Sequence, residues 1–138
     1  MPKKKASTPP KKRGTAEHWK DEPDEHDFPA AVAYLSLLFP EQLAASLVEG
    51  LLHGEKLVRQ AKDLLRASRL PLLPTDNPHV AADLRKVSGG ERLSPVLLVR
   101  GQGEKGLALL VADGYHRICA SYHLDEDADI PCRLVDLP

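Results

Sequence analysis

A short stretch in the last third of the chain constrains its fold most strongly. Residues 107–112 are an apolar run that predicts a buried strand, and the dipeptide Asp113-Gly114 breaks that strand. The residues from Tyr115 to Leu124 then predict a helix that begins directly after the turn. A chain that runs from a buried strand into a helix within two residues must combine both kinds of element, so we expect an α+β fold.

The elements expected around this stretch complete a small mixed sheet with helices over residues 69–138. Asn77 followed by Pro78 is typical of a helix start, because Asn caps the first turn and Pro fits its first position. This helix is expected to run to about Ser88 and to end at the glycine pair that follows. Strands are expected at residues 69–74, 95–100, 107–112 and 130–135, with the second and third joined as a hairpin.

Residues 28–68 are expected to form a helical segment that precedes this domain. The run at 30–39 is nearly all apolar, and the next run places Leu43 and Leu47 on one helical face. A third helix is expected over residues 55–67, with apolar side chains on one side and charged ones on the other. This segment either covers the core or provides a surface for a homodimer.

The first 27 residues are expected to be a disordered, charged tail. The net charge of −1 hides an asymmetry, because seven basic residues in 1–20 are followed by five acidic ones in 21–27. Trp19 is the one large apolar side chain here, which is too little to offset the entropy of ordering the segment. Lysine-rich tails often contact nucleic acid, so residues 1–20 are a candidate nucleic-acid contact. The alternative is a solubilising tail, or one that folds back on its own acidic residues.

Length and composition exclude several classes of protein. A chain of 138 residues allows one compact domain and rules out a large multidomain enzyme. No apolar run reaches 18 residues and no apolar stretch follows the N-terminal lysines, so we expect no membrane contact and a cytoplasmic location. Cys119 and Cys132 are expected to be small buried hydrophobic groups, and no metal site is predicted.

The turn at residues 113–117 has the features of an anion site. The first turn of a helix offers backbone N–H groups without partners and a partial positive charge, and this geometry binds phosphate. Gly114 lets a ligand approach the backbone closely, and the side chains of His116 and Arg117 add hydrogen-bond donors. Asp113 either caps the helix, orients His116 or holds a metal ion that accompanies a nucleotide. The alternative is that Asp113 is only a cap and that Arg117 only pairs with a nearby acid.

These residues resemble the ParB/sulfiredoxin superfamily. The similar segments are Leu93-Ser94-Pro95-Val96-Leu97-Leu98-Val99, then Asp113-Gly114-Tyr115-His116-Arg117-Ile118-Cys119-Ala120 after the hairpin, and Ile130-Pro131-Cys132. Members of this superfamily hold nucleotide phosphates with this motif: ParB partition proteins bind and hydrolyse CTP, sulfiredoxin uses ATP, and a related free-serine kinase uses ADP. The resemblance implies that Gly114, His116 and Arg117 contact phosphate, with Asp113 and Tyr115 beside them. It also implies that the ligand is CTP, ATP or ADP, with Mg²⁺.

The chain also departs from the family pattern. Tyr115 stands where sulfiredoxin has its catalytic cysteine, so reduction of sulfinic acids is not expected. ParB partition proteins continue into a helix-turn-helix domain, whereas this sequence ends at Pro138, so a complete partition protein is not expected. Asn77 and His79 are a further candidate pair, by similarity to a ParB loop that faces the nucleotide. The alternative is that Asn77 caps a helix and that His79 is solvated.

We therefore expect a nucleotide- or phosphate-binding domain of the ParB type. No Glu has an obvious place as the base of a kinase reaction, and Glu91, after Gly89-Gly90, is the nearest option. Nucleotide hydrolysis and phosphotransfer are therefore both left open. The alternative function is a non-catalytic module that contacts nucleic acid or a partner protein through the basic tail and the helical segment.

Overall fold

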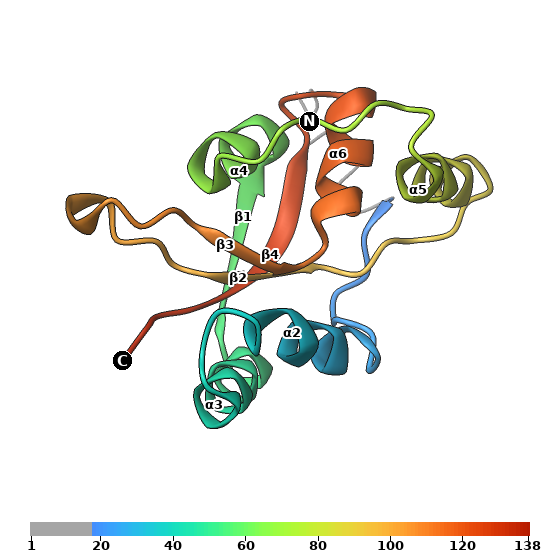
Figure 1. Cartoon of the computed structure of the whole chain (residues 1–138). Coiled ribbons are helices and arrows are strands. Elements are labelled where there is room, and N and C mark those ends of the chain that lie inside the picture. The colour runs from blue at the N-terminus through green and yellow to red at the C-terminus, as the bar shows by residue number, and fades with distance from the viewer. Residues whose placement is uncertain (1–17) are drawn as a thin grey trace, which may run out of the picture.

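The computed structural model describes residues 18–138, which form a mixed α+β structure around one sheet (Figure 1). The four strands are β1 (Glu55–Gln60), β2 (Val96–Val99), β3 (Leu110–Asp113) and β4 (Asp129–Val135), in the order β1-β4-β2-β3. β4 pairs antiparallel with β1 and parallel with β2, and β2 pairs antiparallel with β3. The expected α+β class is therefore confirmed.

Helices cover both faces of this sheet (Figure 1). On one side lie α4 (Ala61–Ser68), α5 (Pro78–Ser88) and α6 (Tyr115–Leu124), and on the other lie α2 (Asp27–Leu35) and α3 (Glu41–Leu52). A 3₁₀ turn, η1 (Gly103–Lys105), forms the tip of the β2–β3 hairpin. Among the described residues, no helix is long and apolar enough to cross a membrane.

The central strand β2 shows why its sequence is a continuous apolar run. Val96 and Leu98 belong to the hydrophobic cluster that packs under α4 and α6, while Leu97 and Val99 belong to the cluster over α2 and α3. Successive side chains of a strand point to opposite faces, so a strand covered on both faces is apolar at every position. All four residues are at most 1% exposed.

Several elements lie where the sequence predicts them. The segments α3, α5, α6, β2 and β4 match their predictions within about two residues, and β3 pairs with β2 as a hairpin. Asn77 caps α5 as expected, because its Oδ1 accepts hydrogen bonds from the backbone N–H groups of His79 (3.0 Å) and Val80 (3.2 Å).

The helical segment covers the core, as one of the two alternatives expects, through buried side chains such as Ala31, Leu35 and Leu47. The apolar run at 30–39 is not buried throughout, because Leu37 is 82% exposed at the α2–α3 corner. A homodimer through this corner stays a prediction.

The helix predicted over residues 55–67 is wrong. Its first half is strand β1, which pairs with β4 along its whole length, from Glu55 opposite Leu134 to Gln60 opposite Asp129. Only the second half is helical, as α4. The segment 28–68 is thus not wholly helical, and it contributes an edge strand to the sheet built by residues 69–138.

The edge strand predicted at residues 69–74 is also wrong, because this segment is irregular. Its backbone groups bond to side chains of α6 instead of to a neighbouring strand. The Tyr115 hydroxyl donates to the Pro71 carbonyl oxygen at 2.5 Å, and the Leu73 N–H donates to Cys119 Sγ at 3.5 Å. The ring of His123 contacts the Leu73 carbonyl oxygen through Nε2 at 2.7 Å. The segment therefore lies along α6.

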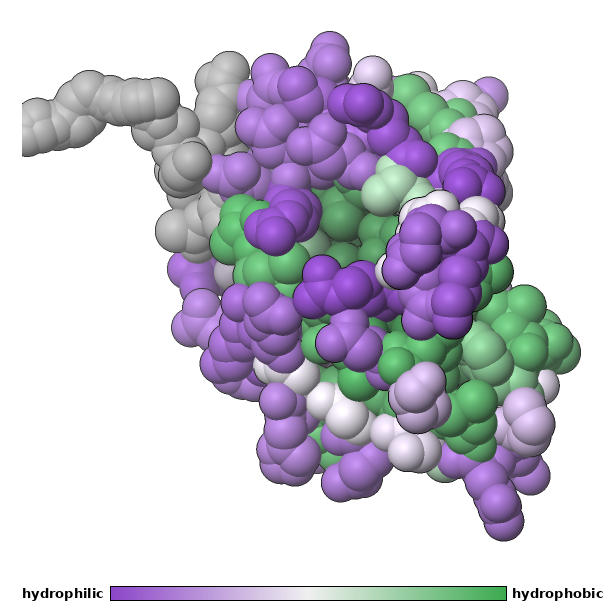
Figure 2. All heavy atoms as spheres, turned by 90° about the vertical axis from the view of Figure 1, so that its left-hand side faces the viewer, coloured by the Kyte–Doolittle hydropathy of each residue, from purple (hydrophilic) through white to green (hydrophobic). Residues whose placement is uncertain are grey.

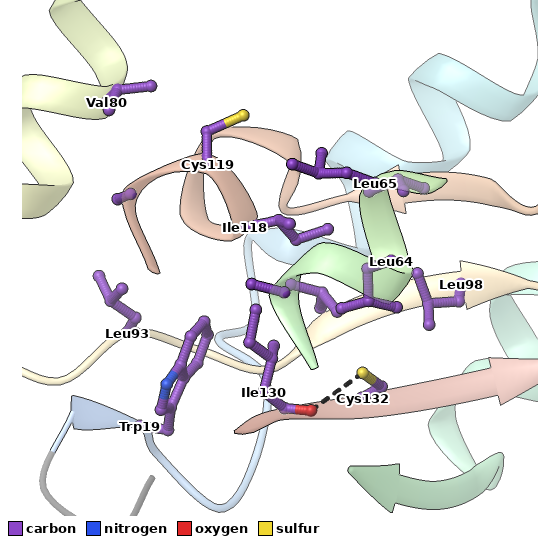
Figure 3. Close-up of a cluster of buried hydrophobic side chains, with 14 of the residues drawn as sticks. Trp19, Leu64, Leu65, Val80, Leu93, Leu98, Ile118, Cys119, Ile130 and Cys132 are labelled. Carbon is purple, nitrogen blue, oxygen red and sulfur yellow. Dashed lines mark hydrogen bonds between the residues drawn. The ribbon is translucent and has the colours of Figure 1, made fainter. Parts of the chain in front are cut away.

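The N-terminal residues differ from the expected disordered tail from residue 18 onward, and residues 1–17 lie outside the described part. Trp19 is 4% exposed and lies against Leu93 and Ile130 in the core (Figure 3). The Leu93 backbone holds the segment by accepting from Lys20 N–H at 2.8 Å and donating to the His18 oxygen at 2.7 Å. Residues 18–27 thus pack on the domain.

Candidate functional site

The site predicted from the sequence begins at Gly114, where the chain passes from β3 into α6. Gly114 has φ +113° and ψ 11°, a left-handed conformation that favours glycine. A Cβ at this position would lie 2.5 Å from Val96 Cγ1, and Val96 is fully buried. The turn therefore strongly favours glycine, and α6 begins without a side-chain cap. The N–H groups of its first turn consequently have no capping side chain, which gives them the capacity to bind an anion.

Arg117, expected to grip phosphate, is held by acids and backbone. Its NH2 donates to Asp113 Oδ2 at 3.1 Å and to the Pro95 carbonyl oxygen at 3.2 Å. Its NH1 lies 3.9 Å from Oδ1 of Asp27, the first residue of α2. The Arg117 side chain is only 15% exposed, and its buried Nε has no hydrogen-bond partner among residues 18–138. Arg117 thus joins the start of α6 to α2 across the sheet.

Two carboxylates compete for this one guanidinium. Burial raises the pKa of Asp113, Arg117 opposes that rise, and the neighbouring Asp27 adds to it. Asp27 is 2% exposed and also accepts a hydrogen bond from the Asp24 N–H at 3.0 Å. The positive charge of Arg117 is therefore neutralised by two carboxylates of the protein itself. Asp113 is the closer of the two, at 3.1 Å, and Asp27 lies at 3.9 Å.

His79 and His116 come together although they belong to separate segments of the sequence. Their ring centroids are 4.6 Å apart, with the planes tilted by 43°. Asn77 caps the start of α5 by accepting from the His79 N–H and so positions His79. The structure thus brings His79, His116 and the start of α6 into one place, with Asn77 in a supporting role.

Asp83 is a member of this cluster that the sequence analysis missed. It is 9% exposed, and burial raises the pKa of its carboxyl group. Burial also lowers the pKa of His116, and His79 lowers it further while Asp83 opposes the change. Asp83 lies four residues after His79, so the two share one face of α5. That spacing was the signal in the sequence that could have identified it.

Tyr115 has a structural contact that the motif did not suggest. Its hydroxyl donates to the Pro71 carbonyl oxygen, and burial raises the pKa of this phenol. Its ring centroid is 5.6 Å from that of His116. Tyr115 therefore ties the irregular segment before α5 to the start of α6, next to the histidine pair.

The two cysteines are buried, as expected. Burial raises the pKa of the Cys119 thiol, and it raises the pKa of Cys132 to about 12. The Cys132 thiol donates to the Ile130 carbonyl oxygen at 3.2 Å (Figure 3). Both thiols stay protonated at neutral pH, which makes them poor nucleophiles.

One group of side chains has the spacing of metal ligands. One ligand atom each of Asp24, His26 and Asp27 lies within 4.8 Å of the others. The contacts of the two carboxylates explain the group without an ion, because Asp24 pairs with Lys20 at 2.7 Å and Asp27 faces Arg117.

Comparison with known proteins adds no further assignment. No protein-family model matches the chain, and no similar protein was found among curated proteins or solved structures. The resemblance to the ParB/sulfiredoxin superfamily therefore rests on the motif residues and on the order of the elements around them.

Proposed function

We propose that this protein binds a nucleotide, or another ligand that carries a phosphate group, at the start of α6. The observation that carries the proposal is the contact between His79 and His116, at 4.6 Å between ring centroids. The sequence singled out each histidine separately for a phosphate site, and α5 and α6 bring the two rings together beside Gly114. The resemblance to the ParB/sulfiredoxin superfamily supports the same ligand class.

The chemistry of the site suits an anion. The backbone N–H groups of residues 115–117 begin α6, so they donate toward a ligand that approaches over Gly114. His79 of α5 and His116 of α6 add imidazole N–H donors where the two helices meet. Arg117 contributes positive charge from behind the turn, where Asp113 and Asp27 already hold it. In this proposal the phosphate binds the backbone and the two histidines, and Arg117 supports the turn.

Nucleotides commonly carry Mg²⁺, an ion that prefers carboxylate and other oxygen ligands. The two carboxylates nearest the turn, Asp113 and Asp27, face Arg117 and are poorly placed to bind a cation. We therefore assign the ion no ligand from this pair. Asp83 and the two histidines, His79 and His116, are the ionisable side chains of this cluster that are available for proton transfer to or from a bound ligand.

Thermal shift with CTP, ATP, ADP and GTP, each with and without Mg²⁺, tests the proposal. A ligand present at 100 times its dissociation constant stabilises the folded state by about 2.7 kcal/mol, or about 5 to 10 °C in Tm for a domain of this size. The shift should be lost in His79→Ala and in His116→Ala, and it should be kept in His53→Ala, an exposed histidine at the end of α3.

The pH dependence adds a second criterion. Burial lowers the pKa of His116, so the ring is mostly neutral in the free protein near neutral pH. An anion binds more tightly once this ring gains a proton, because the imidazole is then positively charged. Affinity should therefore rise as the pH falls from 8 to 6, and this rise should be smaller in His116→Gln. No stabilisation by any of the four nucleotides, or equal stabilisation of the His79→Ala protein, would overturn the proposal.

A further inference from the structure

A pocket of about 280 Å³ opens between α4 and the β2–β3 hairpin, away from the residues of the α6 site. Its floor is apolar and is made by Leu57, Leu64, Ala67, Leu98, Leu109 and Leu134. Three charged side chains, Arg59, Asp63 and Arg100, also line it. Figure 2 shows this face of the molecule, with a hydrophobic hollow inside a hydrophilic rim.

The hollow exists because α4 is short. This helix has eight residues and ends at Ser68, because the next residue, Arg69, has φ +59° and so breaks the helix. The hairpin extends beyond the area that so short a helix covers. Apolar side chains of β2 and of the segment before β3 are therefore left at the floor of an open pocket.

The rim leaves one positive charge without an acidic partner. Arg100 pairs with Asp136 at 2.6 Å and with Glu55 at 3.3 Å. Asp63 pairs with Arg66 at 3.4 Å. Arg59 donates to the backbone oxygen of Val58 at 2.8 Å, and it has no carboxylate partner within the described residues.

We propose that this pocket binds a medium-chain carboxylic acid, with its alkyl chain on the leucines and its carboxylate on Arg59. An apolar floor supplies affinity, and one charged group at the rim orients the ligand. A guanidinium without an acidic partner offers paired N–H donors that match the two oxygens of a carboxylate. A methylene takes up about as much room as a water molecule in the liquid, about 30 Å³. The pocket of about 280 Å³ then accommodates a chain of roughly nine carbons.

Calorimetry on the full chain with hexanoate, octanoate, decanoate and dodecanoate, below their micelle concentrations, tests this proposal. Each buried methylene contributes about 0.8 kcal/mol, so affinity should rise about fourfold per added carbon and level off near decanoate. Decanol, which lacks the carboxylate, should bind at least tenfold more weakly than decanoate.

Two pairs of variants locate the site. Arg59→Gln should lose the preference for decanoate over decanol, whereas Arg92→Gln, at an exposed arginine outside the pocket, should keep it. Ala67→Trp should fill the pocket and abolish binding without loss of the fold, because Ala67 is exposed on α4. Its control is Ala33→Trp, at an exposed position on α2.

Three results would overturn the proposal. They are an affinity that does not depend on chain length, a decanoate preference that survives in Arg59→Gln, and full binding to a folded Ala67→Trp protein. Since none of the pocket residues belongs to the α6 site, failure here leaves the proposed phosphate site untouched.

Discussion

The replacement of Gly114 by alanine tests the local geometry on which the candidate site depends. The new Cβ would lie 2.5 Å from Val96 Cγ1 and 2.9 Å from Val96 Cβ, both shorter than normal van der Waals contact. Val96 is fully buried in the central strand, so it has little room to move aside. The same change also places an L side chain at φ +113°.

These two effects differ in size and can be separated. A left-handed backbone costs a residue with a Cβ about 1–2 kcal/mol. Overpacking a well-packed core costs typically about 1–3 kcal/mol more. Gly114→Ala should therefore lower the free energy of unfolding by about 2–5 kcal/mol. Gly90→Ala and Gly106→Ala should cost only about 1–2 kcal/mol, because both have positive φ but no atom within 4 Å of a new Cβ.

Urea unfolding followed by tryptophan fluorescence measures these differences. Trp19 is the only tryptophan and is 4% exposed, so its emission reports loss of the core. The urea midpoint should fall most for Gly114→Ala, with similar m-values for all proteins. If Gly114→Ala and Gly90→Ala have equal midpoints, the close approach to Val96 is not what requires glycine at the start of α6.

Three further predictions concern other parts of the fold. Asn77→Ala removes the acceptor that caps α5, so it should lower the free energy of unfolding by about 1 kcal/mol in the same assay, whereas the adjacent Asp76→Ala should have no effect. Burial lowers the folded-state pKa of His116, so the unfolded chain takes up a proton on this residue more readily than the folded protein does. The free energy of unfolding is therefore unaffected by protonation of His116 above the unfolded pKa of about 6.5 and decreases as the pH falls below it. His116→Gln should consequently flatten the decline in urea midpoint between pH 7 and pH 5, and an unchanged slope would contradict this assignment. Glu22→Gln should lower the urea midpoint, because the carboxylate of Glu22 accepts a hydrogen bond from Arg133, which is only 4% exposed. Glu25→Gln is the control, and equal midpoints for the two variants would refute the pairing.

Local signals in the sequence predicted the elements that local chemistry determines. Asn77 and Pro78 define the start of α5 with atoms that lie within three residues of each other. The Asp113-Gly114 dipeptide defines the start of α6 for a similar reason, since a positive φ favours glycine wherever it occurs. The strands β2 and β4 were found because apolar residues fill them.

The errors came from contacts between residues far apart in the chain. Residues 55–60 have an apolar spacing that also fits a helix, and only their pairing with β4, some 70 residues later, selects a strand. Trp19 was assigned to a tail because its contact with Leu93 cannot be found from composition. In the same way, two acids of the tail prove to be ion-pair partners of the domain: Glu22 pairs with the buried Arg133, and Asp27 with the partly buried Arg117.

The candidate site shows the same division. The sequence identified the glycine turn and both histidines, because each belongs to a recognisable motif. It could not show that Arg117 is already balanced by Asp27 from α2, nor that Asp83 completes the cluster between α5 and α6. Both depend on the packing of helices against each other and across the sheet.

Binding of a phosphate group by the backbone at the start of α6 is tested most directly by a titration of the ¹⁵N-labelled protein. The titrant is the nucleotide that gives the largest thermal shift, and binding is followed through the backbone amide resonances. The amides of Tyr115, His116 and Arg117 should shift most and should saturate together with the ring signals of His79. Saturable shifts confined to another part of the molecule, with these three amides unmoved, would contradict this binding mode.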